Sequence, residues 1–410
     1  MMDARPAARA PGLSQKSVCP PVPTSLPAVA KSPSPSLVYA GAGVELVSVS
    51  PLGDGYGGER PSTLYITTDL EHWRKVTPPQ SLVRTNCGYP GFEDASFINA
   101  SVGWVTGWNL ANDAVTIYRT SNGGRSWTAI PGGYHSENAG ASVLVQLLSP
   151  TVAYKETLEP TGPGMSLAVT TDAGRTWKVV DSCPRPTKAG YQVPCVMPMS
   201  FRDALHGFAA GGIPYFWEPS IGNFFATSNG GSTWVPEHPP MPRTLHACPR
   251  SSGGFPPSIL CYVGLPVFGN ARDGVLSIEV VPGSAAVVAF DVTTDGGSHW
   301  RLRAQRSTTE VAPSIYPLKS PLVSMPSNAS WWIVGWKDGE VTTQVTSDAG
   351  ARWRSVTATI PSGEPISLAA VGGSSAFLTI AHENPISGGT ERLLVTFNRG
   401  RSWTTLKLPA

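Results

Sequence analysis

An eight-residue motif that ends in tryptophan recurs along this chain and limits the folds that the chain can adopt. The motif has Thr at the first position, Asp or Asn at the third, Gly at the fifth and Trp at the eighth. Five copies keep this form, at residues 120–127, 170–177, 227–234, 293–300 and 346–353. A copy at 396–403 keeps these four residues but is looser at the positions between them, with Phe397 and Arg399, and a shorter copy without the glycine covers 67–73. Seven of the 13 tryptophans therefore end a repeat whose spacing is 50 to 66 residues.

Each copy has the residue pattern of a tight turn between two β-strands. Alternating apolar residues precede the turn, the Asp or Asn oxygen can accept turn amides, and Gly supplies the residue with φ > 0. Trp begins the return strand and packs its ring between layers. A calcium loop would need several carboxylates in each turn, and no copy has them. We therefore interpret the following positions as structural: Asp69, Trp73, Asn122, Gly124, Trp127, Asp172, Gly174, Trp177, Asn229, Gly231, Trp234, Asp295, Gly297, Trp300, Asp348, Gly350, Trp353, Asn398, Gly400 and Trp403.

The repeat length predicts a β-propeller, in which each blade is a four-stranded antiparallel sheet. A second pattern precedes each motif and supplies the first two strands of the blade, as in Phe201 followed by Gly207 and Phe208. We predict an all-β fold, a seven-bladed propeller over residues 36–410, with the motif turn between the third and fourth strands of each blade. No strand is left for a shared closing blade, so the ring closes by side-chain packing, alone or with help from the N-terminal tail.

Composition excludes several classes of partner. Charged residues make up only 14% of the chain, the net charge is +2, and no Lys/Arg-rich run occurs, so we expect no nucleic-acid partner. No apolar run approaches the ~20 residues of a membrane span, so we expect no membrane insertion. Residues 1–35 contain eight prolines and no large apolar cluster, which predicts a disordered tail without a visible signal peptide. We expect a monomer with no cofactor and no metal.

The six cysteines bear on the compartment: Cys19, Cys87, Cys183, Cys195, Cys248 and Cys261. The last four form two close pairs, each around a Pro-rich segment, and this arrangement favours two disulfides. A zinc site that joins the second pair to His238 and His246 is the alternative, but its spacing matches no common zinc finger. The first two cysteines are candidates for a third bridge. Disulfides predict an oxidising compartment, so we expect an extracytoplasmic protein.

The recurring motif resembles the Asp-box, or bacterial neuraminidase repeat, whose pattern is Ser/Thr-x-Asp-x-Gly-x-Thr-Trp. The resemblance covers about residues 36–408. Asp-box propellers include sialidases, xyloglucan-cleaving glycosidases, sortilin-type receptors and the photosystem II assembly and stability factor. The additional pattern from Phe201 to Phe208, with Asp203, Ala204 and Gly207, looks most like the last group, and so does the number of blades.

The blade topology predicts which face of the ring is variable. In each blade, the turn from the first strand to the second and the turn from the third strand to the fourth lie on one face of the ring, which we term the motif face. The other connections lie on the opposite face, which we term the loop face. Long connections are expected on the loop face at residues 77–92, 181–196, 212–223, 237–261, 305–317 and 382–391. Loops on a rigid scaffold commonly carry function, so we expect the binding surface there.

Three consecutive aromatic residues are the candidate binding residues on the loop face. Tyr215, Phe216 and Trp217 lie between two prolines, Pro214 and Pro219. Exposed aromatic side chains commonly anchor proteins or sugar rings. The alternative is that these rings cover a small apolar cluster of a neighbouring loop, and the sequence leaves both interpretations open.

Catalysis is the competing hypothesis. A sialidase needs three arginines that hold the sugar carboxylate, and five arginines fall in motif turns on the other face. The arginines left for the loop face are Arg84, Arg185, Arg243, Arg250 and Arg306. Candidates for the acid pair of another glycosidase are Glu93, Asp94, Glu156, Glu159, Glu218 and Asp338. No sequence pattern fixes the geometry of such a pair, so no catalytic residue is assigned.

These observations favour an extracytoplasmic, non-catalytic propeller scaffold that binds a protein or a glycan through its loop face. A glycoside hydrolase of the sialidase or xyloglucanase type is the alternative. A third hypothesis, an assembly factor for a membrane protein complex, follows from the family resemblance alone.

Overall fold

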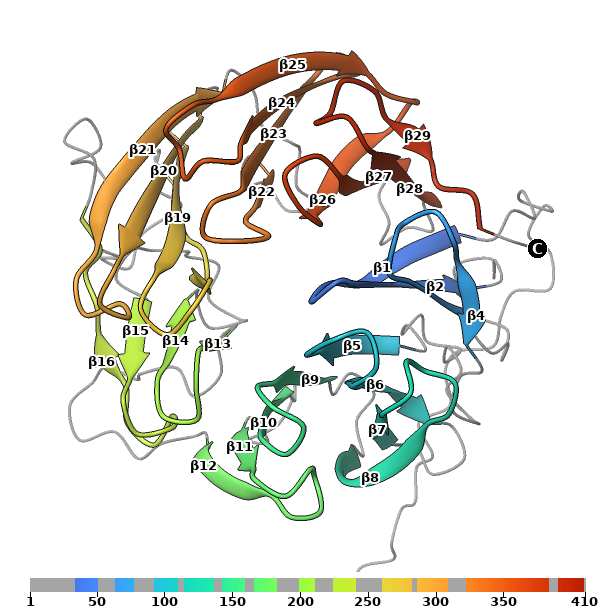
Figure 1. The fold of residues 1–410 in the computed structure, drawn as a ribbon, viewed down its shortest axis with the longest axis vertical. Helices are drawn as coiled ribbons and strands as arrows, with labels where there is room; N and C mark the ends of the chain where they lie inside the picture. The colour runs from blue at the N-terminus through green and yellow to red at the C-terminus, as the bar shows by residue number, and fades with distance from the viewer. Residues whose placement is uncertain are drawn as a thin grey trace, which may run out of the picture.

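The structure, a computed structural model, is a ring of β-sheets. It describes residues 34–50, 63–76, 92–109, 114–135, 142–158, 166–182, 199–210, 224–240, 260–281, 286–308, 322–382 and 390–408. The regular elements in these ranges are all β-strands, and they form seven antiparallel sheets around one centre (Figure 1). No helix within the described ranges has the length and apolar character that crossing a membrane requires. The predicted all-β, seven-bladed propeller is confirmed.

The first three blades have four strands each, and the chain runs from the innermost strand to the outermost one (Figure 1). Blade one contains β1 (Ser34–Gly41), β2 (Val44–Ser50), β3 (Thr63–Thr67) and β4 (Arg74–Val76). Blade two contains β5 (Phe92–Phe97), β6 (Gly103–Asn109), β7 (Ala114–Thr120) and β8 (Thr128–His135). Blade three contains β9 (Ser142–Leu147), β10 (Ala153–Leu158), β11 (Ser166–Thr170) and β12 (Lys178–Ser182).

The other four blades repeat this order, and in blade five two short strands share the innermost place. Blade four contains β13 (Met199–Phe201), β14 (Gly207–Ala210), β15 (Phe224–Thr227) and β16 (Val235–Pro236). Blade five contains β17 (Leu260–Val263) and β18 (Val267–Phe268), which both pair with β19 (Gly274–Val281), then β20 (Ala286–Thr293) and β21 (Arg301–Thr308). Blade six contains β22 (Leu322–Ser324), β23 (Trp331–Lys337), β24 (Glu340–Thr346) and β25 (Arg354–Thr359). Blade seven contains β26 (Glu364–Ala370), β27 (Ala376–His382), β28 (Thr390–Thr396) and β29 (Thr404–Thr405).

A compact set of hydrogen bonds holds each motif turn, and the copy in blade three shows it. Thr170 Oγ1 donates to Asp172 Oδ1 (2.8 Å) and accepts the N–H of Gly174 (2.9 Å). Asp172 Oδ1 also accepts the N–H of Thr176 (2.9 Å). Ala173 and Gly174 have φ of 60° and 80°, a conformation that favours glycine. The same bond between the fifth-position N–H and the first-position threonine occurs in the copies that begin at residues 120, 227, 293, 346 and 396.

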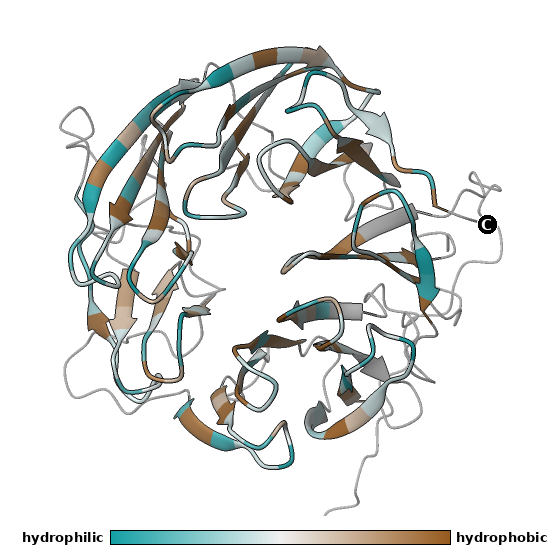
Figure 2. Cartoon of the chain, in the orientation of Figure 1, coloured by the Kyte–Doolittle hydropathy of each residue, from teal (hydrophilic) through white to brown (hydrophobic). Residues whose placement is uncertain are grey.

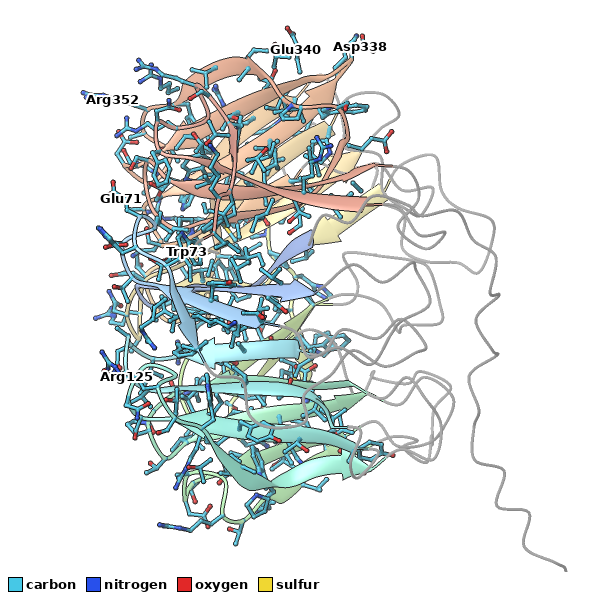
Figure 3. All side chains as sticks on the ribbon, turned by 90° about the vertical axis from the view of Figure 1, so that its right-hand side faces the viewer. Glu71, Trp73, Arg125, Asp338, Glu340 and Arg352 are labelled. Carbon is cyan, nitrogen blue, oxygen red and sulfur yellow. The ribbon has the colours of Figure 1, made fainter. Side chains whose placement is uncertain are left out.

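The motif turn also contacts the first turn of its own blade in blades two to seven. The N–H of the fourth motif residue donates to a carbonyl oxygen of that turn at 2.8 to 2.9 Å, for example from Gly123 to Ser101. Both turns therefore lie on the motif face. Three residues of different motif turns, Glu71, Arg125 and Arg352, lie along this face in Figure 3. The strand ends that border the undescribed segments are on the opposite side, because neighbouring strands are antiparallel.

Seven apolar cores hold the ring together, one between each pair of neighbouring blades. Each core includes one motif tryptophan, which packs towards the preceding blade: Trp127, Trp177, Trp234, Trp300, Trp353, Trp403 and Trp73. The seventh core closes the ring, since Val47 of β2 packs with Phe377 of β27 and Val395 of β28. In Figure 2 the strands in the middle of the blades, such as β20 and β23, are largely apolar. The described strands of blades seven and one form separate sheets, so these two blades join by side-chain packing.

A few element bounds differ from those predicted. β1 begins at Ser34, so its first two residues lie in the segment predicted as tail, and the rest of that segment is outside the described residues. β21 extends to Thr308, so the first part of the connection predicted at 305–317 is strand. Each motif tryptophan precedes the outer strand instead of beginning it, as Trp177 precedes β12 at Lys178.

Candidate functional site

Side chains of the innermost strands connect neighbouring blades around the centre of the ring. Tyr39 donates its hydroxyl to the carbonyl of Phe97, which joins blade one to blade two (3.0 Å). Gln146 exchanges two hydrogen bonds with the backbone of Phe201, which joins blade three to blade four (2.9 and 2.7 Å). Ser200 donates to a carbonyl of blade five (3.0 Å). These contacts, which we term the inner-strand bonds, fix the wall of the ring's centre.

A cavity of ≈ 510 Å³ lies against this wall. Residues of β1, β5, β9, β10, β13, β18 and the segment before β18 line it, so five consecutive blades contribute. Pockets for small organic ligands commonly measure ~300–1,000 Å³, so the cavity is large enough for one. Two carboxyl groups, Asp94 and Glu156, are in its lining. Both belong to the set of acids that the sequence nominated for a glycosidase pair.

Asp94 joins the inner strands of blades two and three. Its side chain extends from β5, is partly buried, and accepts the N–H of Val145 on β9 through Oδ2 (2.7 Å). Burial raises the pKa of Asp94 to about 6, and hydrogen bonds from the N–H groups of Val145 and Ala95 limit the rise. Asp94 is therefore mostly ionised at neutral pH and can exchange a proton just below it.

Glu156 is the more deeply buried carboxyl group of the cavity. Its residue is 7% exposed on β10, and its carboxyl accepts the N–H of Met199 at the start of β13. The Oε2 atom of this carboxyl group is buried and has no hydrogen-bond partner. Burial, with a smaller contribution from the charge of Asp94, raises the pKa of Glu156 to about 8. Without a ligand, Glu156 is thus largely protonated at neutral pH.

Strand position places both carboxyl groups nearer the loop face than the motif face. β5 runs from the loop face to the motif face, and Asp94 is its third residue. β10 runs in the opposite direction, and Glu156 is two residues before its end at Leu158. The two groups come from residues 62 positions apart in the sequence and share one end of the cavity.

The other described candidates lie elsewhere. Asp338 is exposed at the turn between β23 and β24 (Figure 3). Arg306 of β21 donates from Nε to Gln344 Oε1 (3.0 Å), and its guanidinium lies 5.2 Å from the centroid of the Trp353 ring, so it joins blades five and six. Glu93 and Cys261 belong to β5 and β17, and their side chains are outside the described set. The remaining candidates are outside the described residues: Tyr215, Phe216, Trp217, Glu159, Glu218, Arg84, Arg185, Arg243, Arg250, Cys19, Cys87, Cys183, Cys195 and Cys248.

The sequence interpretation did not assign Tyr39, Gln146 or Tyr154 to the wall of the cavity. It also did not single out Glu156, although the strand register shows a signal for it. In each blade, the first threonine of the motif pairs with a residue of the second strand. Three residues further along that second strand, the seven blades have Ser48, Thr106, Glu156, Ala210, Ser277, Val334 and Thr379. Only blade three has an ionisable group at this place, and an alignment of the repeats would have shown it.

Two further described carboxyl groups that are buried and have a raised pKa lie outside this lining. Burial raises the pKa of Glu45 on β2 to about 7, and the charge of Asp69 contributes to the rise. Asp291 on β20 is 0% exposed, neither oxygen has a hydrogen-bond partner, and burial raises its pKa to about 7. A raised pKa therefore does not distinguish a site in this protein, whereas placement in the cavity does.

Several solved structures are similar to this chain. The uncharacterized protein lmo1340 from Listeria monocytogenes EGD-e is similar, with a TM-score of 0.53 and 7% identity over 93% of this chain and 97% of that one. YCF48 from Cyanidioschyzon merolae is similar over 90% of this chain and 97% of that one, with a TM-score of 0.48 and 15% identity. The GH74 xyloglucanase from Xanthomonas campestris has a TM-score of 0.27 and 12% identity, over 92% of this chain and 62% of that one. No family model and no curated protein matches the sequence. At 7% identity, the similarity to the Listeria protein is one of fold alone, and function has to be argued from the site.

Proposed function

We propose that this protein is an extracytoplasmic, non-catalytic scaffold that binds a protein or a glycan through the loop face and the adjoining cavity. The observation that carries the proposal is the cavity, whose two carboxyl groups lie at its loop-face end. The motif face offers fewer polar groups to a ligand, because its Asp and Asn side chains accept hydrogen bonds within their own turns. A closed ring with interblade cores supplies the rigid support that a binding surface needs.

A pair of double variants tests which face binds. The cavity variant carries Asp94→Asn and Glu156→Gln, and the motif-face control carries Glu71→Gln and Arg125→Gln. Both are immobilised beside the unchanged protein and exposed to a glycan array and to extracts of the producing organism. We expect a ligand that the unchanged protein and the control retain and the cavity variant loses. A ligand lost only by the motif-face control would overturn the proposal.

The proposed location depends on disulfides that join Cys183 to Cys195 and Cys248 to Cys261. Each pair is close in the sequence and encloses prolines, as short disulfide-closed loops of exported proteins commonly do. Thiol titration of protein purified without reductant, followed by peptide mapping, tests this pairing. Four free thiols at these positions would refute both the disulfides and the argument for an oxidising compartment.

Glycoside hydrolysis is the second candidate, and one observation favours it. Asp94 and Glu156 share a cavity and have pKa values of about 6 and about 8, so one can be ionised while the other holds a proton. Glycosidases use such a pair as base or nucleophile and general acid. No arginine is among the described residues that line the cavity, so the sialidase form lacks support there.

A hydrolysis panel separates the two candidates. Under the second candidate, a xyloglucan oligosaccharide or another glycoside is cleaved, with a maximum between about pH 6 and pH 8. Glu156→Gln and Asp94→Asn then each lower kcat by ~100-fold or more, because each removes one proton-transfer group. Absence of turnover, or turnover that both variants retain, excludes this assignment.

A further inference from the structure

The uncharged polar side chains of the cavity are already engaged with the protein. Tyr39 donates to the Phe97 carbonyl, and Tyr154 donates to the Ala204 carbonyl (2.8 Å). Both ends of Gln146 are used by Phe201. Ser96 Oγ accepts the N–H of Leu147 (2.9 Å), and Ser200 donates to blade five. A ligand that bound these groups would have to break bonds that hold neighbouring blades together.

The carboxyl groups are different, because they keep acceptor capacity. An ionised carboxylate has about four lone-pair sites. The Asp94 carboxyl accepts two backbone N–H groups, that of Val145 at Oδ2 and that of Ala95. Glu156 accepts one N–H, from Met199, and its Oε2 has no partner although the residue is more than nine-tenths buried. A buried acceptor without a donor destabilises the folded protein. Oε2 is such an unpaired acceptor when Glu156 is ionised, so the ionised form of the pair calls for a hydrogen-bond donor.

The charge of the lining specifies the kind of donor. The titratable groups in the described lining are Tyr39, Asp94, Tyr154 and Glu156, and none of them is a lysine, arginine or histidine that could supply a positive charge. Two carboxylates that repel each other are stabilised by a positive charge between them. A divalent metal would need more oxygen ligands than two carboxylates supply, and no group of three His, Cys, Asp or Glu among the described residues is arranged to hold one. An organic cation with several N–H donors fits these conditions.

We propose that the central cavity binds an organic cation, a guanidinium or ammonium group, with Asp94 and Glu156 as its two anionic partners. This inference rests on the proposed binding function and specifies its ligand chemistry. The volume of ≈ 510 Å³ admits a basic side chain together with part of the chain that carries it. The occupant enters at the loop-face end, where both carboxyl groups lie.

Binding of such a group depends on pH in a defined direction. Both carboxyl groups must be ionised to pair with the cation, while a guanidinium stays charged throughout. Asp94 and Glu156 face each other, and Tyr39 faces Asp94. Tyr39 also faces Glu45, and burial raises the pKa of the Tyr39 hydroxyl. Affinity therefore rises from about pH 5.5 to about pH 8.5, and binding releases protons.

Two probes that differ in one charge test the proposal. N-acetyl-arginine amide has a guanidinium, and N-acetyl-citrulline amide has a neutral ureido group of nearly the same shape. By calorimetry, we expect the arginine probe to bind the unchanged protein about tenfold or more tightly than the citrulline probe. Agmatine is the third probe, and stronger binding of the arginine amide than of agmatine would indicate a polypeptide source for the cation.

Matched variants complete the design. Asp94→Asn and Glu156→Gln preserve shape and are expected to remove the preference for arginine, and Glu156→Gln also removes most of the pH dependence above pH 7. Asp338 is an exposed acid at a loop-face turn, so Asp338→Asn is the control. It is expected to keep both the preference for arginine and the pH dependence of binding. Thermal unfolding shows that each variant is folded. Equal binding of the two amides, or no binding of arginine amide up to about 10 mM, overturns the cation assignment. The glycan-array and extract experiment judges the proposed function separately.

Discussion

The carboxyl groups of the motif turns and those of the central cavity have opposite environments in the same fold. Asp172 lies partly exposed on the motif face, and hydrogen bonds from Thr176 and Thr170 lower its pKa to about 2. Glu156 lies in the cavity wall, and its burial raises the pKa to about 8. The first carboxyl is surrounded by donors from its own turn. The second has an oxygen that no described donor reaches.

Acidic residues therefore have two different roles in this repeat protein, one structural and one that is a candidate for function. The third motif position is Asp or Asn in every copy, because the turn needs an Oδ1 acceptor that both residues supply. The second side-chain atom also pairs with the hydroxyl at the seventh position: Asp172 Oδ2 accepts from Thr176, and Asn122 Nδ2 donates to Ser126. The position of Glu156 has no ionisable group in the other blades. Repetition therefore marks residues that build the blade, and departure from the repeat marks a candidate for function. Four changes, from the largest expected effect to the smallest, test this contrast.

The largest effect is expected from adding a methyl group within a motif turn. Gly297 has φ of 91°, and an added Cβ would lie 2.3 Å from Phe208 Cζ in the core between blades four and five. Gly297→Ala is expected to lower the free energy of unfolding by about 3 kcal/mol, from backbone strain and overpacking together. Denaturant unfolding measures it. Gly339→Ala is the control, because Gly339 has φ of 86° but an added Cβ meets nothing within 4 Å, so only the strain of about 1 kcal/mol applies. Equal losses would show that the packing of the motif turn contributes little.

Glu156→Gln is expected to change how stability depends on pH. The folded-state pKa of about 8 lies above the unfolded value near 4.3, so the unchanged protein is most stable below that value and loses stability as pH rises to about 8. The variant has no such proton to lose, and at pH 8 it should be about 2 kcal/mol more stable than the unchanged protein. At about pH 4, below the unfolded pKa, the two should be nearly equal. Parallel pH profiles of the denaturant midpoint would contradict the buried, protonated state of Glu156.

Asp291→Leu asks whether a buried acid outside the cavity behaves like one inside it. Asp291 lies two residues before the motif threonine of its blade, where blade seven has Leu394. Its folded-state pKa of about 7 exceeds the unfolded value, so stability is lost as pH rises from about 4 to about 7. The variant is expected to be about 1 kcal/mol more stable at pH 8 and to keep full binding of arginine amide. Loss of that binding would show that the acid outside the cavity takes part in recognition.

The smallest effect is expected from Asp172→Asn in the exposed turn. Asn already occupies this position in other copies, where Asn122 Oδ1 accepts the Ser126 N–H and Nδ2 donates to the Ser126 hydroxyl. We expect no measurable change in the unfolding midpoint at pH 7. Stability from Asp172 is present above its unfolded pKa and is lost as pH falls towards about 2, so the variant should resist acid better. Asp172→Ala, which removes the acceptor, should lower the midpoint at every pH. A large loss in the Asn variant at pH 7 would give the charge itself a role.

Most of the fold could be predicted from the sequence because the determinants of a blade are local. Strand alternation, a Thr whose hydroxyl bonds two turn groups, and Gly at a residue with φ near 80° act within eight residues. Seven repeats of this unit predict seven sheets, and seven sheets are observed. The bounds of individual strands were predicted less well. β1, for example, begins at Ser34, because pairing with β2 extends it beyond the predicted start.

The candidate site could be predicted only in part. The acids that the sequence nominated include Asp94 and Glu156, but nothing in the sequence pairs them. Tyr39 was not nominated at all, because a tyrosine in an apolar strand has the pattern of a core residue. The aromatic residues 215–217 stay a prediction, since they lie outside the described residues.

The sequence by itself determined the blade, the number of blades and the turn chemistry, because each depends on residues close together in the chain. The tertiary structure decided what happens between blades. It packs Val47 against Phe377 and so joins the first blade to the last. It also brings Asp94 and Glu156 into one cavity, where burial and mutual repulsion raise the pKa of Glu156. Burial and charge repulsion depend on distance in space, and a linear sequence does not contain that distance.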